Sequence, residues 1–365
     1  MYEPDFERLA GLIADCSRLA PGETVTILVQ PAGFPLAEAL IVECYKRGAT
    51  PLAVVRLEEA EVAALCTAPV EYLSQRHANL VALVGQTDVI IPLYCQYQNP
   101  ALQAQVPPVK MAAYMQSRVP FQEVLYDGNR RLVITDFPTA AQADFYGVSF
   151  PEYWEAFWRA MEIDYEALRR RVADLTAFVQ GREEVHLLSA KGTDVRLRIG
   201  GRRVFGDDGL VGLPGETDRD ILLNLPSGEV CLAPQEDGAE GVAVFDFAFV
   251  GGRRVADLEV RFEGGRATLV AAAEGLERVE EYFASGTGDP YVIAELGIGV
   301  NSSLTKPFGS ILMDEKIAGT VHLALGDNRT MGGATESSIH QDFIILAPRV
   351  TCDGELLLAD GELKI

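Results

Sequence analysis

The chain has 365 residues, of which 48% are hydrophobic and 23% are charged, a balance that is typical of folded globular proteins and excludes a disordered chain. This length exceeds what one hydrophobic core usually serves, so we expect about two domains. The 53 acidic residues outnumber the 31 basic ones and give a formal charge of -22, which argues against nucleic acid or an anionic membrane as a partner.

The first part of the chain alternates between helix-like and strand-like segments. Apolar residues recur at helical spacing over residues 7–19 and 37–47, and Gly48 is placed to end the second helix. The apolar, β-branched runs at residues 25–29 and 51–55 predict buried strands.

Three further apolar runs continue this pattern. Residues 80–84, 89–94 and 131–135 predict strands, and residues 151–180 predict one or two amphipathic helices. Apolar strands that alternate with helices indicate a parallel sheet covered on both faces. We therefore expect residues 1–180 to form an α/β domain with a parallel sheet.

After Gly181 the pattern changes to alternating residues and glycine-rich turns, which are typical of antiparallel hairpins. The segments include EVHLLSA, TDVRLRI, AVFDFAFV and RRVADLEVRF. One helix is expected at residues 275–285. We expect residues 181–365 to form an α+β domain rich in antiparallel strands.

The cysteines and the N-terminal segment predict a cytoplasmic protein. The six cysteines are widely spread and none forms a C-x-x-C pair, so we interpret them as buried thiols. The N-terminal segment carries acidic residues where a secretory signal has a basic patch and an apolar run. No segment stays apolar for the length of a membrane span, so we expect no membrane partner.

His340 and Asp342 form the first candidate metal site. They are two residues apart, which places both side chains on one face of a strand. An imidazole and a carboxylate placed in this way suit zinc, cobalt, manganese or ferrous iron, although a lone H-x-D also occurs by chance. His77 and His186 have no candidate ligand close by in the sequence, and we interpret both as structural.

Three other residues are candidates because of their surroundings. His322 lies in the apolar strand GTVHLALG, where an imidazole needs a hydrogen-bonding partner in the core or a metal. Glu295 lies in the apolar segment VIAELGIGVN, where an ionised carboxylate is costly unless it is paired or metal-bound. Glu229 begins a strand after a Pro-Ser-Gly turn, and an exposed turn residue is the alternative there.

Four strings in the C-terminal half carry a resemblance to a known family. They are LPSGEVCLAP, IAELGIGVN, DEKIAGTVHLALGDN and GGATESSIHQD, in this order. They resemble the successive motifs of the metallo-aminopeptidase family of aminopeptidase T and aminopeptidase S (leucyl aminopeptidase, thermophilic type). The N-terminal half agrees with that family in its general layout.

The resemblance implies a metal-binding catalytic domain in the C-terminal half, with two divalent ions such as Zn, Co or Mn. Carried over position by position, it implies five metal ligands, namely Glu229, Glu295, His322, His340 and Asp342. Glu295 is expected to bridge the ions, and Glu315 is a further candidate as a ligand or as a support for the ligands. The resemblance also implies a homodimer.

One position departs from the family. The peptidases have a tyrosine near the carbonyl oxygen of the substrate where this chain has Arg329, so Arg329 is a candidate oxyanion donor. The stretch over residues 326–338 is shorter than in the peptidases and resembles the related dihydroxypyridine dioxygenases, which hold one ferrous iron. Those enzymes have a histidine at the position of Glu295, yet His322, His340 and Asp342 could still form a two-histidine, one-carboxylate set.

Three functions are consistent with these residues. The leading hypothesis is an aminopeptidase-like hydrolase that cleaves an N-terminal or small-molecule amide with a metal-activated water, with Glu295 and Arg329 as catalytic residues and a small molecule or short peptide as substrate. The alternative is a ferrous-iron, Fe(II), ring-cleaving dioxygenase acting on a hydroxylated heteroaromatic. The third is a non-catalytic binding protein whose histidines lie in the core.

Overall fold

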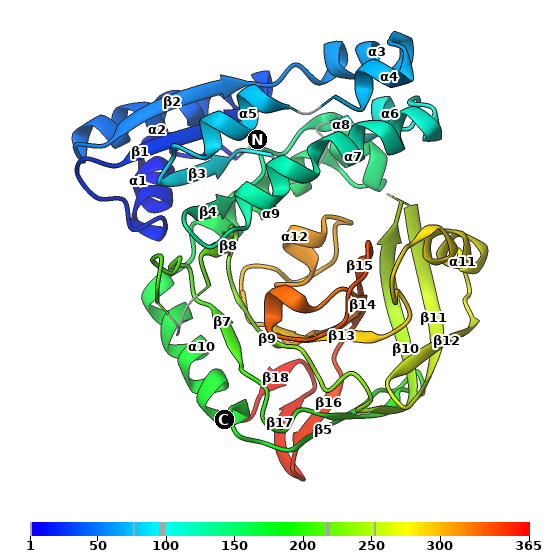
Figure 1. The fold of residues 1–365 in the computed structure, drawn as a ribbon. Helices are drawn as coiled ribbons and strands as arrows, with labels where there is room; N and C mark the ends of the chain where they lie inside the picture. Colours follow the sequence, from blue (N-terminus) through cyan, green and yellow to red (C-terminus); the bar gives the residue numbers. More distant parts are fainter. Residues whose placement is uncertain (1, 76, 95–98, 217–219, 252) are drawn as a thin grey trace. The chain divides into compact units, whose positions relative to one another are not determined.

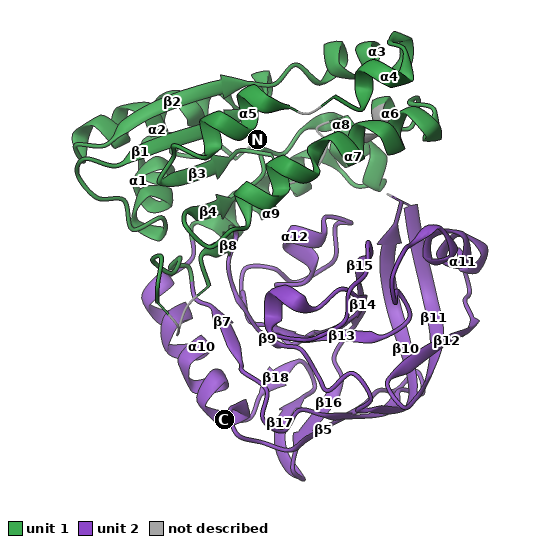
Figure 2. Ribbon diagram, viewed as in Figure 1, with its two compact units in different colours: residues 1–162, 209–225 green, residues 163–208, 226–365 purple. Residues whose placement is uncertain are grey.

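The computed structural model describes residues 2–75, 77–94, 99–216, 220–251 and 253–365. Contacts divide the chain into two compact units, shown in Figure 2. Unit 1 contains Met1–Glu162 and Gly209–Leu225, and unit 2 contains Ile163–Asp208 and Pro226–Ile365.

Unit 1 contains a five-stranded parallel sheet in the order β2-β1-β3-β4-β8 (Figure 1). Its strands are β1 (Thr24–Val29), β2 (Thr50–Val55), β3 (Val89–Pro92), β4 (Arg131–Ile134) and β8 (Leu222–Asn224). The predicted parallel sheet is confirmed. Its last strand, β8, comes from a segment after Gly181 and pairs with β4, which the sequence pattern did not indicate.

The helices of unit 1 are α1 (Phe6–Cys16), η1 (Pro31–Gly33), α2 (Phe34–Lys46), α3 (Glu58–Thr67), α4 (Val70–Leu73), α5 (Ala78–Val84), α6 (Pro100–Gln103), α7 (Pro108–Leu125), α8 (Ala140–Tyr146) and α9 (Phe150–Met161). The strand predicted at residues 80–84 is wrong, because this run belongs to α5. Leu80, Val81 and Val84 fit one helix face and pack with Phe121 of α7. A short apolar run fits a buried strand and a buried helix equally well.

Unit 2 begins with α10 (Tyr165–Val179), which packs against β7 and β9. Its antiparallel sheet has 13 strands, with the path β18-β17-β16-β5-β6-β10-β15-β14-β13-β9-β7, and β11 and β12 extend from β10. The predicted antiparallel half is confirmed, as is the helix near residue 275, which is α11 (Leu276–Ser285).

The remaining elements of unit 2 are β5 (Glu184–Leu188), β6 (Asp194–Arg198), β7 (Phe205–Asp207), β9 (Glu229–Leu232), β10 (Ala239–Val250), β11 (Arg253–Glu263), β12 (Arg266–Ala271), β13 (Ile293–Gly299), α12 (Ile311–Asp314), β14 (Val321–Gly326), η2 (Arg329–Met331), β15 (His340–Ile345), β16 (Arg349–Cys352), β17 (Glu355–Ala359) and β18 (Glu362–Leu363).

Two sequence expectations concern thiols and membranes. Cys16, Cys44 and Cys352 are buried free thiols as predicted, whereas Cys66 and Cys231 are partly exposed. Cys95 lies outside the described residues. Among the described residues, no helix combines the length and apolar character that crossing a lipid bilayer requires.

Candidate metal centre

Four adjacent strands of unit 2 carry the five residues predicted as ligands. Glu229 begins β9, Glu295 lies in β13, His322 lies in β14, and His340 and Asp342 lie in β15. These strands are neighbours in the order β15-β14-β13-β9. The sheet therefore brings together residues that are more than 110 positions apart in the sequence, from 229 to 342.

Small residues occupy the neighbouring positions and leave room for the long side chains. In the register of the sheet, Gly299 is opposite Glu229 and Gly297 is opposite His322. A Cβ atom on Gly297 would lie 2.0 Å from Nε2 of His322. The imidazole therefore lies directly over the β13 backbone, which only a glycine permits.

Glu295 is at the centre of the cluster. Its Oε1 lies 3.5 Å from Nε2 of His322, and its Oε2 lies 3.0 Å from Nε2 of His340. Beyond the two histidines, His322 lies 3.6 Å from Oε2 of Glu229, and His340 lies 3.6 Å from Oδ1 of Asp342. The donor atoms form two groups, each within 4.8 Å, that share Glu295: one with Glu229 and His322, the other with His340 and Asp342.

Burial and charge oppose each other in this cluster. Burial alone would lower the pKa of His322, but the carboxylates of Glu295 and Glu229 raise it to about 9. Burial would also lower the pKa of His340, yet Asp342 and Glu295 raise it well above its ordinary value. The two histidines in turn hold the pKa of Glu295 below its ordinary value, against the effect of burial. The carboxylates therefore require cations beside them.

Several atoms fit a bound metal ion. Oε2 of Glu229 is buried and has no hydrogen-bond partner in the described part of the chain, as expected for a group that meets an ion, and Nε2 of His322 faces the same carboxylate at 3.6 Å. Nδ1 of His340 lies 2.7 Å from the carbonyl oxygen of Asp327 and donates to it, which aims Nε2 at the carboxylates. Nitrogen and carboxylate donors suit Zn, Co, Mn or Fe(II).

The cluster is open on one side. The side chain of His340 is 35% exposed, whereas that of His322 is 1% exposed. A molecule from solvent can therefore approach His340, whereas the histidine of the group with Glu229 is closed off. By the exposure of their histidines we call these the open group and the deeper group.

Arg329 is close to the cluster in sequence but has its own partners. It lies in η2, between β14 and β15, with 53% of its side chain exposed, and it pairs with Asp327 at 2.7 Å and Glu336 at 3.5 Å. The backbone carbonyl of Asp327 orients His340. The ion pair between Arg329 and the Asp327 side chain therefore helps to fix the loop between β14 and β15 that positions this histidine. Its role as an oxyanion donor stays a prediction.

The other two histidines lie outside the candidate centre. His77 contacts the hydroxyl of Ser117 at 3.1 Å, and His186 contacts the carboxylate of Asp194 at 2.7 Å. Neither belongs to a group of potential metal ligands among the described residues.

Lys316 is a member of the site that the sequence did not single out. Its side chain is fully buried, and its ammonium lies 2.5 Å from Oε1 of Glu229 and 2.6 Å from Oε1 of Glu315. Glu315, the further candidate, thus contacts the cluster through Lys316. The signal in the sequence was the charged string Asp-Glu-Lys directly before an apolar strand.

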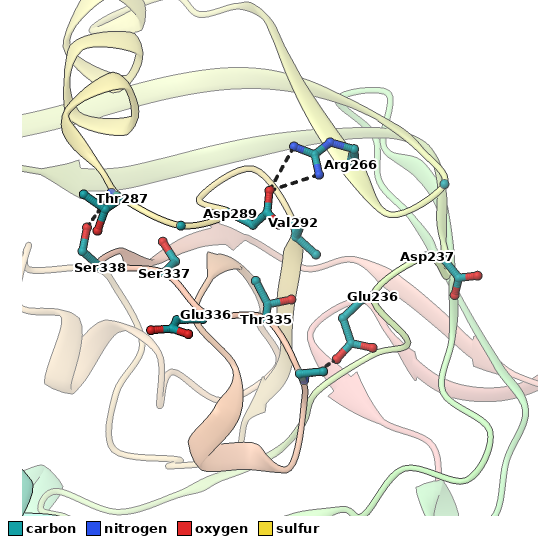
Figure 3. A pocket seen from close by; sticks show the side chains of 13 residues that line it. Glu236, Asp237, Arg266, Thr287, Asp289, Val292, Thr335, Glu336, Ser337 and Ser338 are labelled. Carbon is teal, nitrogen blue, oxygen red and sulfur yellow. Dashed lines mark hydrogen bonds and ion pairs between the residues drawn. The ribbon is translucent and has the colours of Figure 1, made fainter.

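A separate cavity of about 870 Å³ lies beside the segment that leads into β15 (Figure 3). Its described lining includes the carboxylates of Glu236, Asp237, Asp289 and Glu336, and Arg266, which pairs with Asp289 at 3.3 Å. None of the five predicted ligands is among its described lining residues. Each of these four carboxylates pairs with an arginine, namely Arg202, Arg198, Arg266 and Arg329 in the order of Glu236, Asp237, Asp289 and Glu336.

A family comparison places this cluster in context. The family model described as thermophilic metalloprotease (M29) matches residues 2–364. The chain belongs to this M29 family. The resemblance drawn from the four C-terminal strings is thereby confirmed.

Individual relatives agree with this M29 assignment. Aminopeptidase AmpS of Bacillus subtilis (strain 168) is 26% identical over 192 residues, which cover 47% of this chain and 45% of that protein. Aminopeptidase T of Thermus aquaticus is 28% identical over 255 residues, which cover 61% of this chain and 60% of that protein. The matched regions thus span about half of the curated relatives' own lengths.

Two solved structures share the fold of this M29 chain. Wild-type AmpT from Thermus thermophilus matches with a TM-score of 0.84 at 22% identity, covering 99% of each chain. The 2,5-dihydroxypyridine dioxygenase from Pseudomonas putida KT2440 matches with a TM-score of 0.63 at 16% identity, covering 99% of this chain and 98% of that chain.

Replacing Gly297 tests how the imidazole of His322 is accommodated. We expect Gly297→Ala to displace the ring, to cost about 1–3 kcal/mol of stability, and to weaken binding of Zn²⁺ at least about 10-fold. Thermal unfolding and zinc titration measure both effects. The control is Gly11→Ala in α1, where a Cβ meets nothing within 4 Å and stability should stay equal or rise slightly. Wild-type zinc affinity in Gly297→Ala would contradict this account.

Asp314, which precedes Glu315 and Lys316, gives a pH prediction. Burial raises its pKa from 3.8 to about 7, although the backbone N–H groups of Phe308 and Gly309 donate to it. Because the folded state then holds the proton more tightly, this group's contribution to stability falls as pH rises from 3.8 to about 7, then levels off.

Asp314→Asn should therefore become more stable relative to wild type as pH rises through this window, by roughly 1.4 kcal/mol for each pH unit between the unfolded and folded pKa values. Urea unfolding of both proteins from pH 4 to pH 8 measures the difference. A stability difference that does not change with pH would show that the Asp314 carboxylate is not desolvated.

Proposed function

We propose that this protein is a metallo-aminopeptidase-like hydrolase that holds two divalent ions on Glu229, Glu295, His322, His340 and Asp342. The observation that carries the proposal is the placement of Glu295, whose two oxygens face two different histidines. A carboxylate with one oxygen toward each group would serve as a shared ligand for two adjacent ions when both are bound. Membership of a metalloprotease family supports the same interpretation.

Each part of the site has a role in this proposal. When bound, the metal ions supply Lewis acidity, which polarises an amide carbonyl and makes a water molecule a better nucleophile at neutral pH. The buried strands hold the donor atoms in place and exclude bulk water, and the exposed edge at His340 admits the substrate. The Asp327 carbonyl keeps the His340 ring in one orientation.

The proposed substrate is a short peptide or small amide with a free amino group. The chain has a net charge of -22, so its surroundings attract a positively charged amine. The homodimer implied by the resemblance stays a prediction.

The dioxygenase alternative depends on a different donor set. It needs His322, His340 and Asp342 to converge on one iron. Among the described residues, both groups of convergent donors contain Glu295, and neither combines these three residues. The donor arrangement of this chain therefore differs from the one that the dioxygenase alternative needs, and the hydrolase is the better supported function.

Removing Glu295 or His340 tests the proposal. We expect Glu295→Gln and His340→Ala each to lower kcat/KM for aminoacyl p-nitroanilides at least about 100-fold in the presence of Zn²⁺, Co²⁺ or Mn²⁺, because the ions lose a shared or an accessible ligand. His186→Ala is the matched control, since its imidazole also pairs with a carboxylate but lies outside the cluster.

Unchanged turnover by either variant after metal loading would reject the assignment. Oxygen uptake by the ferrous-iron protein with a hydroxylated pyridine, together with no hydrolysis, would favour the dioxygenase instead. A metal content near zero in protein purified without chelator would favour a binding protein.

A further inference from the structure

Lys316 places a permanent cation inside the cluster, on one side only. Its side chain is 0% exposed, and its ammonium lies 2.5 Å from Oε1 of Glu229, 2.6 Å from Glu315 and 3.8 Å from Asp207. Burying a lone ammonium is costly, so these carboxylates hold it in the charged form.

The fold fixes this lysine in position. Gly299 of β13 is opposite Glu229, and a Cβ atom there would lie 2.2 Å from the carbonyl oxygen of Ile317 and 2.8 Å from the carbonyl carbon of Lys316. The carbonyl of Lys316 also accepts a hydrogen bond from the backbone N–H of Asn301, at 2.9 Å. The backbone at Lys316 therefore lies against β13, beside the end of the cluster that holds Glu229.

The contact changes what Glu229 can offer. Lys316 occupies Oε1, and Oε2 is left facing His322 at 3.6 Å. One oxygen of this carboxylate therefore remains for an ion, and the ammonium offsets part of its negative charge while it also contacts Glu315 and Asp207.

Within the part of the chain that the structure describes, Asp342, at the other end of the cluster, has no contact of the kind that Lys316 makes with Glu229. Among the described residues, His340 is its one cationic partner within ion-pair distance, at 3.6 Å. From Lys316, the chain of contacts runs through Glu229, His322 and Glu295 before it reaches His340. Among the described residues, Asp342 therefore has no lysine or arginine within ion-pair distance, and no ammonium occupies either of its oxygens.

We propose that Lys316 makes the two halves of the centre unequal, so that the first divalent ion binds to Glu295, His340 and Asp342 and the second binds more weakly to Glu229, Glu295 and His322. This inference rests on the proposed function, because it assumes two ions at the cluster. Lys316 is a positioning residue here: it orients Glu229, and its charge repels an ion at the deeper group more than at the open one.

The practical consequence is an exchangeable second ion. The deeper group would empty first at low metal concentration, while the open group stays loaded. Activity that needs both ions would then respond to metal concentration over the range of the weaker step.

Calorimetric titration of the metal-depleted full chain with Zn²⁺ tests the order of binding. Wild type should bind two ions, the second at least about 10-fold more weakly. Glu229→Gln should lose the weak step and keep the tight one within about 3-fold, whereas Asp342→Asn should lose the tight step. The reverse assignment would overturn the proposal, and these two variants remain informative even if Lys316 variants fail to fold.

Lys316→Met tests the lysine itself. Two bound ions repel each other, which would weaken binding of the second ion in any two-metal centre. The deciding result is therefore how the variant changes the second step. In Lys316→Met the second ion should bind at least about 10-fold more tightly, while the affinity for the first ion should change less than about 3-fold. A purely structural role would weaken both steps together. Thermal stability of the metal-depleted variant should fall, because three carboxylates lose their cation.

Lys191→Met is the matched control, because Lys191 also contacts two carboxylates, at 2.8 Å from Asp246 and close to Asp257, but lies outside the cluster. It should leave both binding steps unchanged. Two equal steps in wild type, or unaltered steps in Lys316→Met, would overturn the inference and leave the proposed function standing. No zinc binding by wild type would instead reject the proposed function.

Discussion

The arrangement of this centre depends on one buried carboxylate held between two imidazoles. Glu295 lies in an apolar strand, where an isolated negative charge would be strongly unfavourable. His322 approaches one of its oxygens from the adjacent strand β14, His340 approaches the other from β15, the next strand beyond it, and together they keep the carboxylate ionised. The other members of the cluster extend this alternation of charges, with Glu229 beyond one histidine and Asp342 beyond the other.

Glycines in β13 leave the space that the charged side chains of this cluster need. Gly297 lets the His322 ring lie over the β13 backbone, and Gly299 lets the Lys316 backbone approach the same strand. The glycines of the string IAELGIGVN therefore make room for other groups, Gly297 for the imidazole of His322 and Gly299 for the backbone at Lys316. At Gly297 and Gly299, the space left by the missing side chain thus decides where a charged group can lie.

Much of the fold and of the candidate site could be predicted from the sequence, and the features that were missed have physical reasons. Apolar periodicity indicated the parallel and antiparallel halves, and the two-residue spacing of His340 and Asp342 placed both on one strand face. The run at residues 80–84 was assigned to the wrong element because its composition fits either kind. The string Asp-Glu-Lys marked the segment of Lys316 as unusual, but it could not indicate the contact with Glu229, which joins residues 87 positions apart in the chain. The strand β8, far from its partners in sequence, was missed for the same reason.

The central claim is that Glu295 is shared by two metal ions, and anomalous diffraction from crystals grown with Zn²⁺ tests it most directly. We predict two anomalous peaks, one on each side of the Glu295 carboxylate, with the first bounded by His340 and Asp342 and the second by His322 and Glu229. A single peak that does not contact Glu295, or no peak within the cluster at saturating Zn²⁺, would contradict the account.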